Sequence, residues 1–275
     1  MVQELAANER VYLLADQSGL PQITSIWPYV RRERWVSVLG MAHGQPDGGT
    51  PLLIELAGLV SLRVPRGLLD QFYRHGRFAN CLSLLCSELP LVELARALKQ
   101  RTEAELPDRL PVVLRYFDTR TLPLLQKLLH PDQYASFMSC VRSWLYVDRC
   151  GQVQTMASAS EDCSSTAFVP PLLFDTRQER MLIDDGTVDA VIDQLIEQHH
   201  PVMLSATPPE QFDVVCGPAQ AAAAFGISEV HDVMLFCCTA LEHGAGFEQS
   251  NPWAQRLAQY QRGSMTLQEA LTHAA

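Results

Sequence analysis

The sequence predicts an α/β (α+β) fold for the first half of the chain, with a mixed sheet flanked by helices, and a mainly helical second half. In residues 1–150, short apolar runs bounded by Gly, Pro or Asp alternate with amphipathic helical patterns. Residues 151–171 are rich in Ser, Thr and Ala and end in Pro-Pro, which is typical of a connection or an irregular strand pair. We therefore expect an α/β lobe over residues 1–150, a connection over 151–171, and a mainly helical acidic lobe over 172–275.

Five apolar segments in the first lobe predict strands. They are residues 11–16, 35–39, 51–56, 79–86 and 111–117. Helical stripes separate them, one from Leu68 to Tyr73 and another from Leu91 to Leu98. Pro131 begins a further helix, whose apolar spacing continues to Leu145.

The second lobe is predicted from two amphipathic stripes, Val188 to Ile196 and Val230 to Leu241. Further helix starts are indicated by Asn251-Pro252 and by Thr266 with Glu269, which has the spacing of a capping box. These stripes are expected to form the core of the lobe.

Composition limits the classes of protein to consider. With 275 residues and 47% hydrophobic residues, the chain can bury a large core. The N-terminus lacks the pattern of a signal peptide, and the most apolar stretch, residues 51–62, is too short for a membrane span and contains Glu55. We expect a cytoplasmic protein with no membrane partner.

Charge is distributed unequally along the chain. Residues 1–150 carry 17 Lys and Arg against 15 Asp and Glu, a net charge of +2, whereas residues 151–275 carry 4 against 16, a net charge of −12. Phosphates would be repelled from the second half, so no nucleic-acid partner is expected. The acidic surface is expected either to keep the protein soluble or to dock a basic partner, and a docking face would include four aspartates in and just before the helix predicted after Gly186. These are Asp184, Asp185, Asp189 and Asp193.

Short catalytic signatures are missing from the sequence. It has no G-x-S-x-G, no G-x-x-x-x-G-K-[ST], no H-E-x-x-H, and no G-x-G-x-x-G at a strand-to-helix turn. None of the eight cysteines forms C-x-x-C, and most lie in apolar patterns, so buried reduced thiols are expected. We predict no catalytic residue, no cofactor and no metal site.

The most unusual motif is Arg115, Tyr116, Phe117, Asp118 and Arg120, which ends the predicted strand at 111–117. A strand followed by a turn would bring the two arginines close to the aspartate, where a guanidinium can pair with the carboxylate or with turn carbonyls. An active-site edge, a structural ion-pair lock and a partner-binding surface are all compatible with these residue types. The structural lock is favoured, because no His, Lys or second carboxylate nearby could act as a general base.

With "VYLLADQSG", "TPLLIELAG" and "ANCLSLLCS" before it, this motif resembles the type VI secretion effector adaptor or chaperone family (Tap, also called TEC). The resemblance covers residues 11–150 and extends more weakly into the second lobe. The most specific element is the Arg-Tyr-aromatic-Asp-Pro-Arg signature, in which Thr119 stands where the family usually has proline. The resemblance implies a cytoplasmic, non-catalytic bacterial protein that binds a toxic effector and helps load it on the VgrG spike protein.

Two functions of different classes follow. The favoured one is an adaptor or chaperone that binds a type VI secretion effector and the VgrG spike. The alternative is a small-molecule enzyme of unrecognised type, with a cleft between the lobes and a Cys/His pair that includes a thiol such as Cys163.

Overall fold

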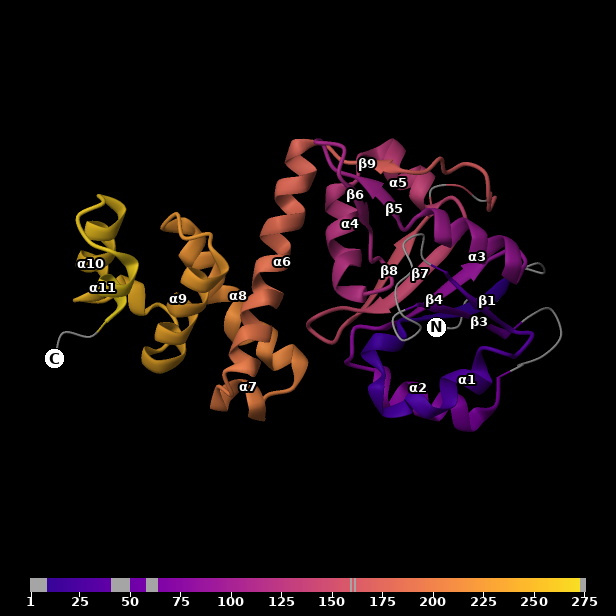
Figure 1. The fold of residues 1–275 in the computed structure, drawn as a ribbon, viewed down its shortest axis with the longest axis horizontal. Helices are drawn as coiled ribbons and strands as arrows, with labels where there is room; N and C mark the ends of the chain where they lie inside the picture. Colours follow the sequence, from indigo (N-terminus) through magenta and orange to yellow (C-terminus); the bar gives the residue numbers. More distant parts are fainter. Residues whose placement is uncertain (1–8, 41–49, 58–63, 159, 161, 273–275) are drawn as a thin grey trace. The chain divides into compact units, whose positions relative to one another are not determined.

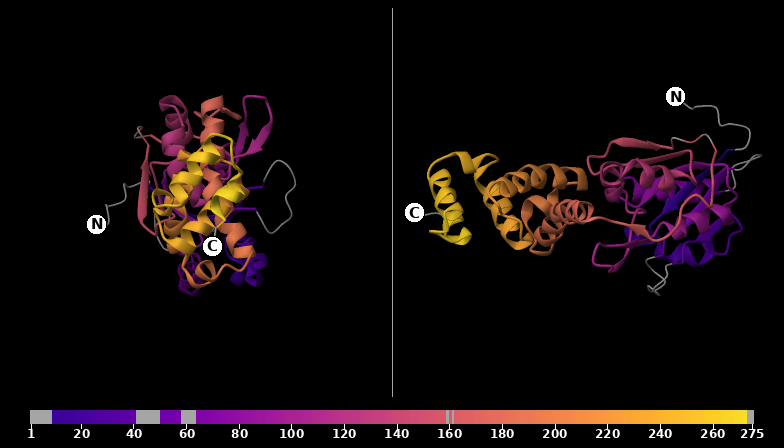
Figure 2. Two further views of the ribbon diagram at one scale, coloured as in Figure 1. Left: turned by 90° about the vertical axis from the view of Figure 1, so that its left-hand side faces the viewer. Right: turned by 90° about the horizontal axis from the view of Figure 1, so that it is seen from above.

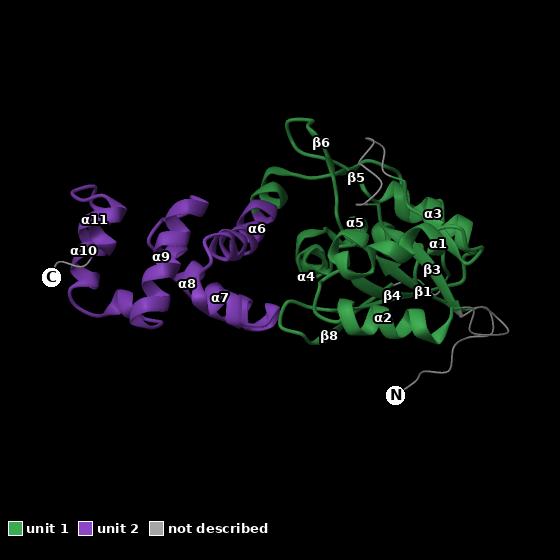
Figure 3. Ribbon diagram, turned by 60° about the horizontal axis from the view of Figure 1, so that its bottom comes forward, with its two compact units in different colours: residues 1–180 green, residues 181–275 purple. Residues whose placement is uncertain are grey.

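The computed structural model describes residues 9–40, 50–57, 64–158, 160 and 162–272. The chain forms two compact units, residues 1–180 and residues 181–275 (Figure 3). Unit 1 contains the strands together with several helices, and unit 2 is helical. The predicted fold class is confirmed.

Unit 1 is built on a six-stranded sheet in which every described pairing is antiparallel. Its strands are β1 (Arg10–Ala15), β2 (Val36–Val38), β3 (Leu52–Ala57), β4 (Leu82–Ser87), β7 (Ser143–Val147) and β8 (Val153–Ala157). They lie in the order β2-β3-β1-β4-β7-β8, so β1 and β4 are central and β8 is an edge strand.

Helices lie on both faces of this sheet (Figure 1). On one face are α1 (Trp27–Val30) and α2 (Arg66–Gly76), whose Trp27 and Phe72 rings stack at 5.7 Å and pack with Leu13 and Ile54. On the other face are α3 (Leu91–Gln100), α4 (Leu122–Leu128) and α5 (Pro131–Met138).

A smaller sheet contains β5 (Glu103–Glu105), β6 (Pro111–Val113) and β9 (Leu172–Leu173), with β5 antiparallel to β6 and parallel to β9. The strand predicted over 111–117 therefore ends at Val113. Tyr116 and Phe117 are both fully buried, with their rings edge to face at 5.8 Å. The chain turns at these two residues instead of continuing the strand.

The helix predicted from Pro131 to Leu145 is also shorter, because it ends at Met138 and is followed by strand β7. The carbonyls of its last turn are occupied: Arg101 donates to the backbone oxygens of Ser136 at 3.0 Å and Phe137 at 2.6 Å. An arginine that is distant in sequence thus binds the helix end, and Leu145 belongs to a strand.

Two glycines allow close packing around the start of β4. A Cβ on Gly19 would lie 2.4 Å from the Cβ of Cys81, and a Cβ on Gly76 would lie 2.1 Å from a methyl carbon of Leu82. Both distances are shorter than any ordinary carbon contact, so only glycine fits without a shift of its neighbours.

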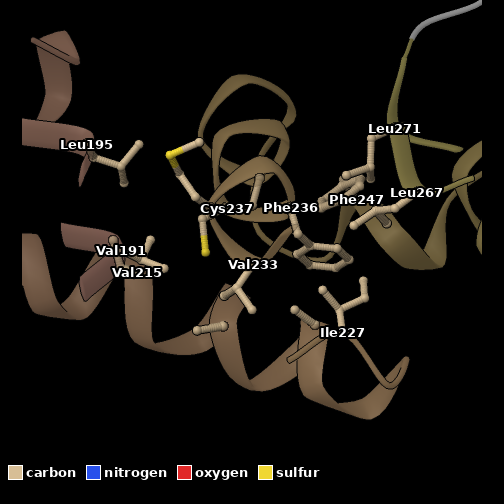
Figure 4. Packing of buried hydrophobic residues seen from close by; sticks show 14 of the residues in the cluster. Val191, Leu195, Val215, Ile227, Val233, Phe236, Cys237, Phe247, Leu267 and Leu271 are labelled. Carbon is tan, nitrogen blue, oxygen red and sulfur yellow. The ribbon is translucent and has the colours of Figure 1, made fainter. Parts of the chain in front are cut away.

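Unit 2 consists of helices that follow one another in chain order (Figure 2). Its elements are α6 (Thr176–Glu197, which begins in unit 1), α7 (Pro201–Ser205), α8 (Pro208–Ala224), α9 (Val230–His243), the 3₁₀ helix η4 (Phe247–Gln249), α10 (Trp253–Gln261) and α11 (Leu267–Leu271). The core side chains come from several of these elements, with Phe236 of α9 next to Phe247 at a ring distance of 4.9 Å (Figure 4). The predicted stripes of the second lobe thus face a shared core.

The segment predicted as a connection, residues 151–171, contains strand β8, and the two compact units divide after Arg180. The first turns of α6 are bound to unit 1, since the fully buried Gln178 donates to the Leu128 carbonyl at 2.9 Å and to the Gln133 side chain at 2.7 Å. The division therefore falls inside α6. In the described part of the chain, no helix is both long and apolar enough to cross a membrane.

Candidate functional site

The Arg115 motif is one of two similar turns in unit 1. Residues 16–21 and residues 118–123 both read Asp-x-x-x-Leu-Pro. Each aspartate precedes a 3₁₀ helix, η1 (Gln17–Gly19) or η3 (Thr119–Thr121), and their backbone angles are nearly identical, with φ/ψ of −79°/112° and −78°/112°. Each carboxylate accepts a hydrogen bond from the backbone N–H two residues later, at 3.0 Å for Asp16 and 3.1 Å for Asp118. The same local chemistry therefore builds both turns.

Each aspartate also forms an ion pair with an arginine. The sequence predicts that Arg115 and Arg120 both lie close to Asp118, and here the structure differs. Arg120 forms a two-pronged ion pair with Asp118, with Nη2 to Oδ2 at 2.7 Å and Nε to Oδ1 at 3.0 Å. Arg115 instead reaches Asp16, with Nη2 to Oδ2 at 3.0 Å. The predicted cluster of three residues is thus divided into two ion pairs, because the second carboxylate comes from the end of β1.

The two aromatic residues of the motif are structural. Tyr116 is fully buried and its hydroxyl donates to the Leu98 carbonyl at 2.6 Å, which binds the turn to the end of α3. Its ring meets those of Phe137 and Trp144 edge to face at 5.7 and 5.4 Å. Burial raises the pKa of the Tyr116 phenol far above its usual range, so it stays neutral.

Both turns are bonded to the start of β4. Asp16 donates its N–H to the Cys81 carbonyl at 2.8 Å, and Thr119 donates its N–H to the Asn80 carbonyl at 2.8 Å. The Thr119 hydroxyl also donates to the Val147 carbonyl at 2.9 Å, which connects the turn to the end of β7. Proline at position 119 would lack both donors, so Thr119 secures the turn through bonds that proline could not make.

Next to these turns lies an apolar groove of about 360 Å³. One wall is α2, with Leu69 and Tyr73, and the floor is formed by β4, β7 and β8. Thr119 is another lining residue, so the motif borders the groove, while Tyr116 and Phe117 stay buried. Burial, and to a smaller extent the carboxylates of Asp16 and Asp118, raise the pKa of the Cys81 thiol in this groove to about 12. This thiol is therefore a neutral apolar group at physiological pH.

The floor of the groove is what we call the open face: Leu82, Leu84, Leu145, Val147 and Val153. Within it, Leu84 is 37% exposed and Val153 is 71% exposed. Leu84 is paired with Leu145 on the neighbouring strand, so apolar side chains lie side by side on this face.

The buried side chain of Arg101 is not indicated by any motif in the sequence. Its side chain is fully buried, and besides the two α5 carbonyls it donates to the Ala97 carbonyl at 2.6 Å and the Ser139 hydroxyl at 2.9 Å. Its guanidinium carbon lies 4.7 Å from the centre of the Phe168 ring. Hydrogen bonds to backbone carbonyls therefore compensate for the burial of a charged side chain that would be expected at the surface from the sequence.

The four aspartates of the predicted docking face all lie on α6. Asp184 and Asp193 are exposed, whereas Asp185 and Asp189 are half-buried. Asp184 also borders a small groove of about 270 Å³ in unit 2, whose other walls include Ala219 and Val233. Their role in docking stays a prediction.

The described thiols differ in exposure. Cys81, Cys140 and Cys237 are buried, Cys150 is exposed, and Cys163 is half-buried. The general expectation of buried thiols is therefore wrong for Cys150, which lies in the turn between β7 and β8. Among the residues that the structure describes, no group of three or more His, Cys, Asp and Glu side chains could hold a metal ion.

Asp16 could have been found from the sequence, because the Asp-x-x-x-Leu-Pro pattern occurs twice. The Arg115–Asp16 pair could not have been, since its partners are 99 residues apart.

Comparison with known proteins gives one match. Residues 11–136, slightly less than half of the chain, match the family model described as "Domain of unknown function (DUF4123)". No curated protein and no solved structure matches the chain. The matched range contains both turns, Arg101 and α2, while β7 and β8 follow it.

Proposed function

Since residues 11–136 carry a DUF4123 domain, we propose that the protein is an adaptor or chaperone that binds a type VI secretion effector and helps load it on the VgrG spike. The resemblance of the Arg115 motif to the effector adaptor family supports this role.

The observation that carries the proposal is the open face. A protein that holds another polypeptide needs an apolar surface that its own fold leaves uncovered, and large exposed apolar patches mark such surfaces. Leu84 and Val153 are exposed next to Leu145, and rigid strands position all three. The two ion-paired turns hold this end of the sheet in shape. Binding would stabilise the held form of the effector by mass action.

The test is co-purification from the native cell. The full-length chain with an affinity tag is isolated, and the proteins that accompany it are identified by mass spectrometry. A toxin-like effector and a spike protein should be enriched over a control in which Leu84→Glu places a charge on the open face. Equal recovery of the same proteins by both forms would remove the open face from the binding site. Recovery of neither protein would contradict the adaptor role.

The enzyme alternative, with a thiol such as Cys163, stays a prediction and can be checked with the same material. Cys163→Ser should leave effector recovery unchanged if the protein is an adaptor. A loss of partner binding by a folded Cys163→Ser variant would favour a functional thiol.

A further inference from the structure

The two faces of β4, β7 and β8 are covered differently. On the face toward α3 and α5, Leu85, Trp144 and Met156 are fully buried. On the opposite face of the same strands, Leu84 and Val153 are exposed and Leu145 is only partly buried. Helices α3, α4 and α5 lie on the first face, and α1 and α2 lie on the second, where α2 forms one side of the groove (Figure 1). Within the described residues, helices therefore cover one face of these three strands and leave the other face partly open.

The uncovered area has the size of one helix. Neighbouring strands lie about 4.8 Å apart, so three strands span about 10 Å. A helix with its side chains is about 10 to 12 Å wide, and about three turns would match strands of this length. A helix in this place would lie beside α2, as helices on the other face lie beside each other.

The edge of β8 is less suited to an added strand. Two of its backbone carbonyls already accept side-chain hydrogen bonds, Ala157 from the Tyr134 hydroxyl at 3.2 Å and Thr155 from Gln126 at 3.5 Å. A partner strand would have to displace these contacts to pair along β8. These hydrogen bonds therefore favour a partner segment that packs on the open face over a partner strand that pairs with β8.

The groove carries one charge among its described lining residues, the guanidinium of Arg77 at the end of α2. Arg77 is exposed and lies over the rings of Phe78 at 4.9 Å and Tyr73 at 5.9 Å. It forms no ion pair with another residue that the structure describes. A ligand with a carboxylate would give this arginine a partner beside an apolar floor.

We propose that the open face binds one amphipathic helix of the effector, about three turns long, whose apolar stripe packs on Leu84, Leu145 and Val153 and whose carboxylate pairs with Arg77. This inference rests on the proposed function, and it adds the conformation and the charge of the bound segment. The helix completes the missing layer of unit 1.

The first experiment locates the bound segment. The photo-reactive residue p-benzoylphenylalanine is placed at Val153 of the full-length chain, in complex with the effector recovered above, and the cross-linked peptide is sequenced. The matched control places it at Val92, which is 65% exposed on α3. Val153 should cross-link to one effector segment with apolar residues spaced by three and four, and Val92 should not.

Other outcomes of this experiment overturn the inference but not the adaptor role. Cross-links from Val92 alone would move the binding site elsewhere. A segment with strictly alternating apolar residues would indicate an added strand, and a cross-link to a second copy of this chain or to its own unit 2 would replace the effector as the occupant. If no effector is recovered at all, it is the proposed function that fails.

The second experiment tests the carboxylate. Arg77→Glu should weaken effector binding about five- to tenfold, measured by isothermal titration with the recovered effector. Replacing the acidic residue of the cross-linked segment by Arg should restore it. The control Arg74→Glu, on an exposed neighbouring position of α2 outside the groove lining, should change binding less than twofold. Equal effects of the two charge reversals, with unchanged thermal unfolding, would rule out a specific pair at Arg77.

Discussion

Asp16 and Asp118 show how one residue type can serve two purposes at the same position of a turn. Each carboxylate accepts the backbone N–H two residues later and also binds an arginine, through Oδ2 in Asp16 and through both oxygens in Asp118. Asp16 is the more buried, with a side chain only 5% exposed against 15% for Asp118. Removing either carboxylate leaves a turn N–H and an arginine without their acceptor. The resulting loss in the free energy of unfolding is larger where these groups are more buried.

Asp16→Ala should therefore destabilise the protein more than Asp118→Ala, by about 1 to 3 kcal/mol for Asp16 and toward the lower end for Asp118. Urea unfolding monitored by tryptophan fluorescence measures both. The control is Asp70→Ala at an exposed position of α2, where a change within about 0.5 kcal/mol is expected. A larger loss for Asp118 than for Asp16 would reverse this ranking.

At the scale of elements, Arg101 joins three parts of unit 1. It follows α3, binds the last carbonyls of α5, and lies against Phe168 in the segment that leads to β9. All four hydrogen bonds go to uncharged oxygens, so the side chain stabilises element ends and does not neutralise a carboxylate.

Arg101→Met should cost on the order of 3 kcal/mol, because several buried carbonyls lose their donor while the apolar volume is roughly kept. Arg101→Lys should also destabilise, since an ammonium group cannot reproduce the planar fork. The free energy of unfolding by urea is the measurement. A Lys variant as stable as the natural chain would show that charge alone is sufficient here.

The close approach of the first turn to β4 makes a second prediction at this scale. Gly19→Ala should destabilise by about 1 to 3 kcal/mol, because its Cβ would press on the Cβ of Cys81, which cannot rotate away. Gly67→Ala, in α2 with open space around it, should be neutral or stabilise by about 0.5 to 1 kcal/mol. Thermal unfolding of the two variants compares them directly, and equal midpoints would contradict the tight packing at Gly19.

Elements with strong local patterns could be predicted from the sequence, and those decided by distant residues could not. Strand β4 is predicted because the run from Ala79 to Cys86 is largely apolar and is followed closely by Pro90. Strand β7 is missed because the spacing from Pro131 to Leu145 remains helical, and only Arg101 shows why the helix stops early. For the candidate site, the motif residues are visible in the sequence. The open face is not, because a pattern shows which residues share a face but not whether a helix covers that face.

Across the whole molecule, ionisation of buried thiols connects stability to pH in both units. Burial raises the pKa of Cys81 and Cys237 to about 12 and that of Cys140 to about 11. In the unfolded chain these thiols ionise near pH 9. Above that pH the unfolded state binds fewer protons than the folded state, so the free energy of unfolding must fall as the pH rises.

Urea unfolding in reducing buffer between about pH 8 and pH 10.5 should show this decline, and Cys140→Ala should reduce its slope relative to the natural chain. The control is Cys150→Ala, which removes an exposed thiol. An identical slope for Cys140→Ala would mean that this thiol ionises in the folded protein.

The charge of unit 2 leads to a prediction about association rates. If its acidic surface docks a basic segment, changing Asp184, Asp185, Asp189 and Asp193 to Asn should slow association at low salt and leave dissociation nearly unchanged, because charge mainly sets the encounter rate. Surface plasmon resonance with the recovered effector at low and high salt tests this. Equal association rates for both forms at low salt would reduce the acidic surface to a solubility feature.

The backbone hydrogen bonds from Asp16 to Cys81 and from Thr119 to Asn80, which we call the clamp, have a consequence for synthesis on the ribosome. The turn at Asp16 is synthesised before β4, yet its carboxylate lacks its arginine until residue 115 has been made, and the second turn bonds to the start of β4 only after Thr119. Contacts of such high sequence separation form late and slow the search for the native fold. The nascent chain therefore carries β1 for about a hundred residues, and β3 and β4 for a shorter length, before the clamp closes. In this interval their apolar faces are open to misassembly or to a folding helper.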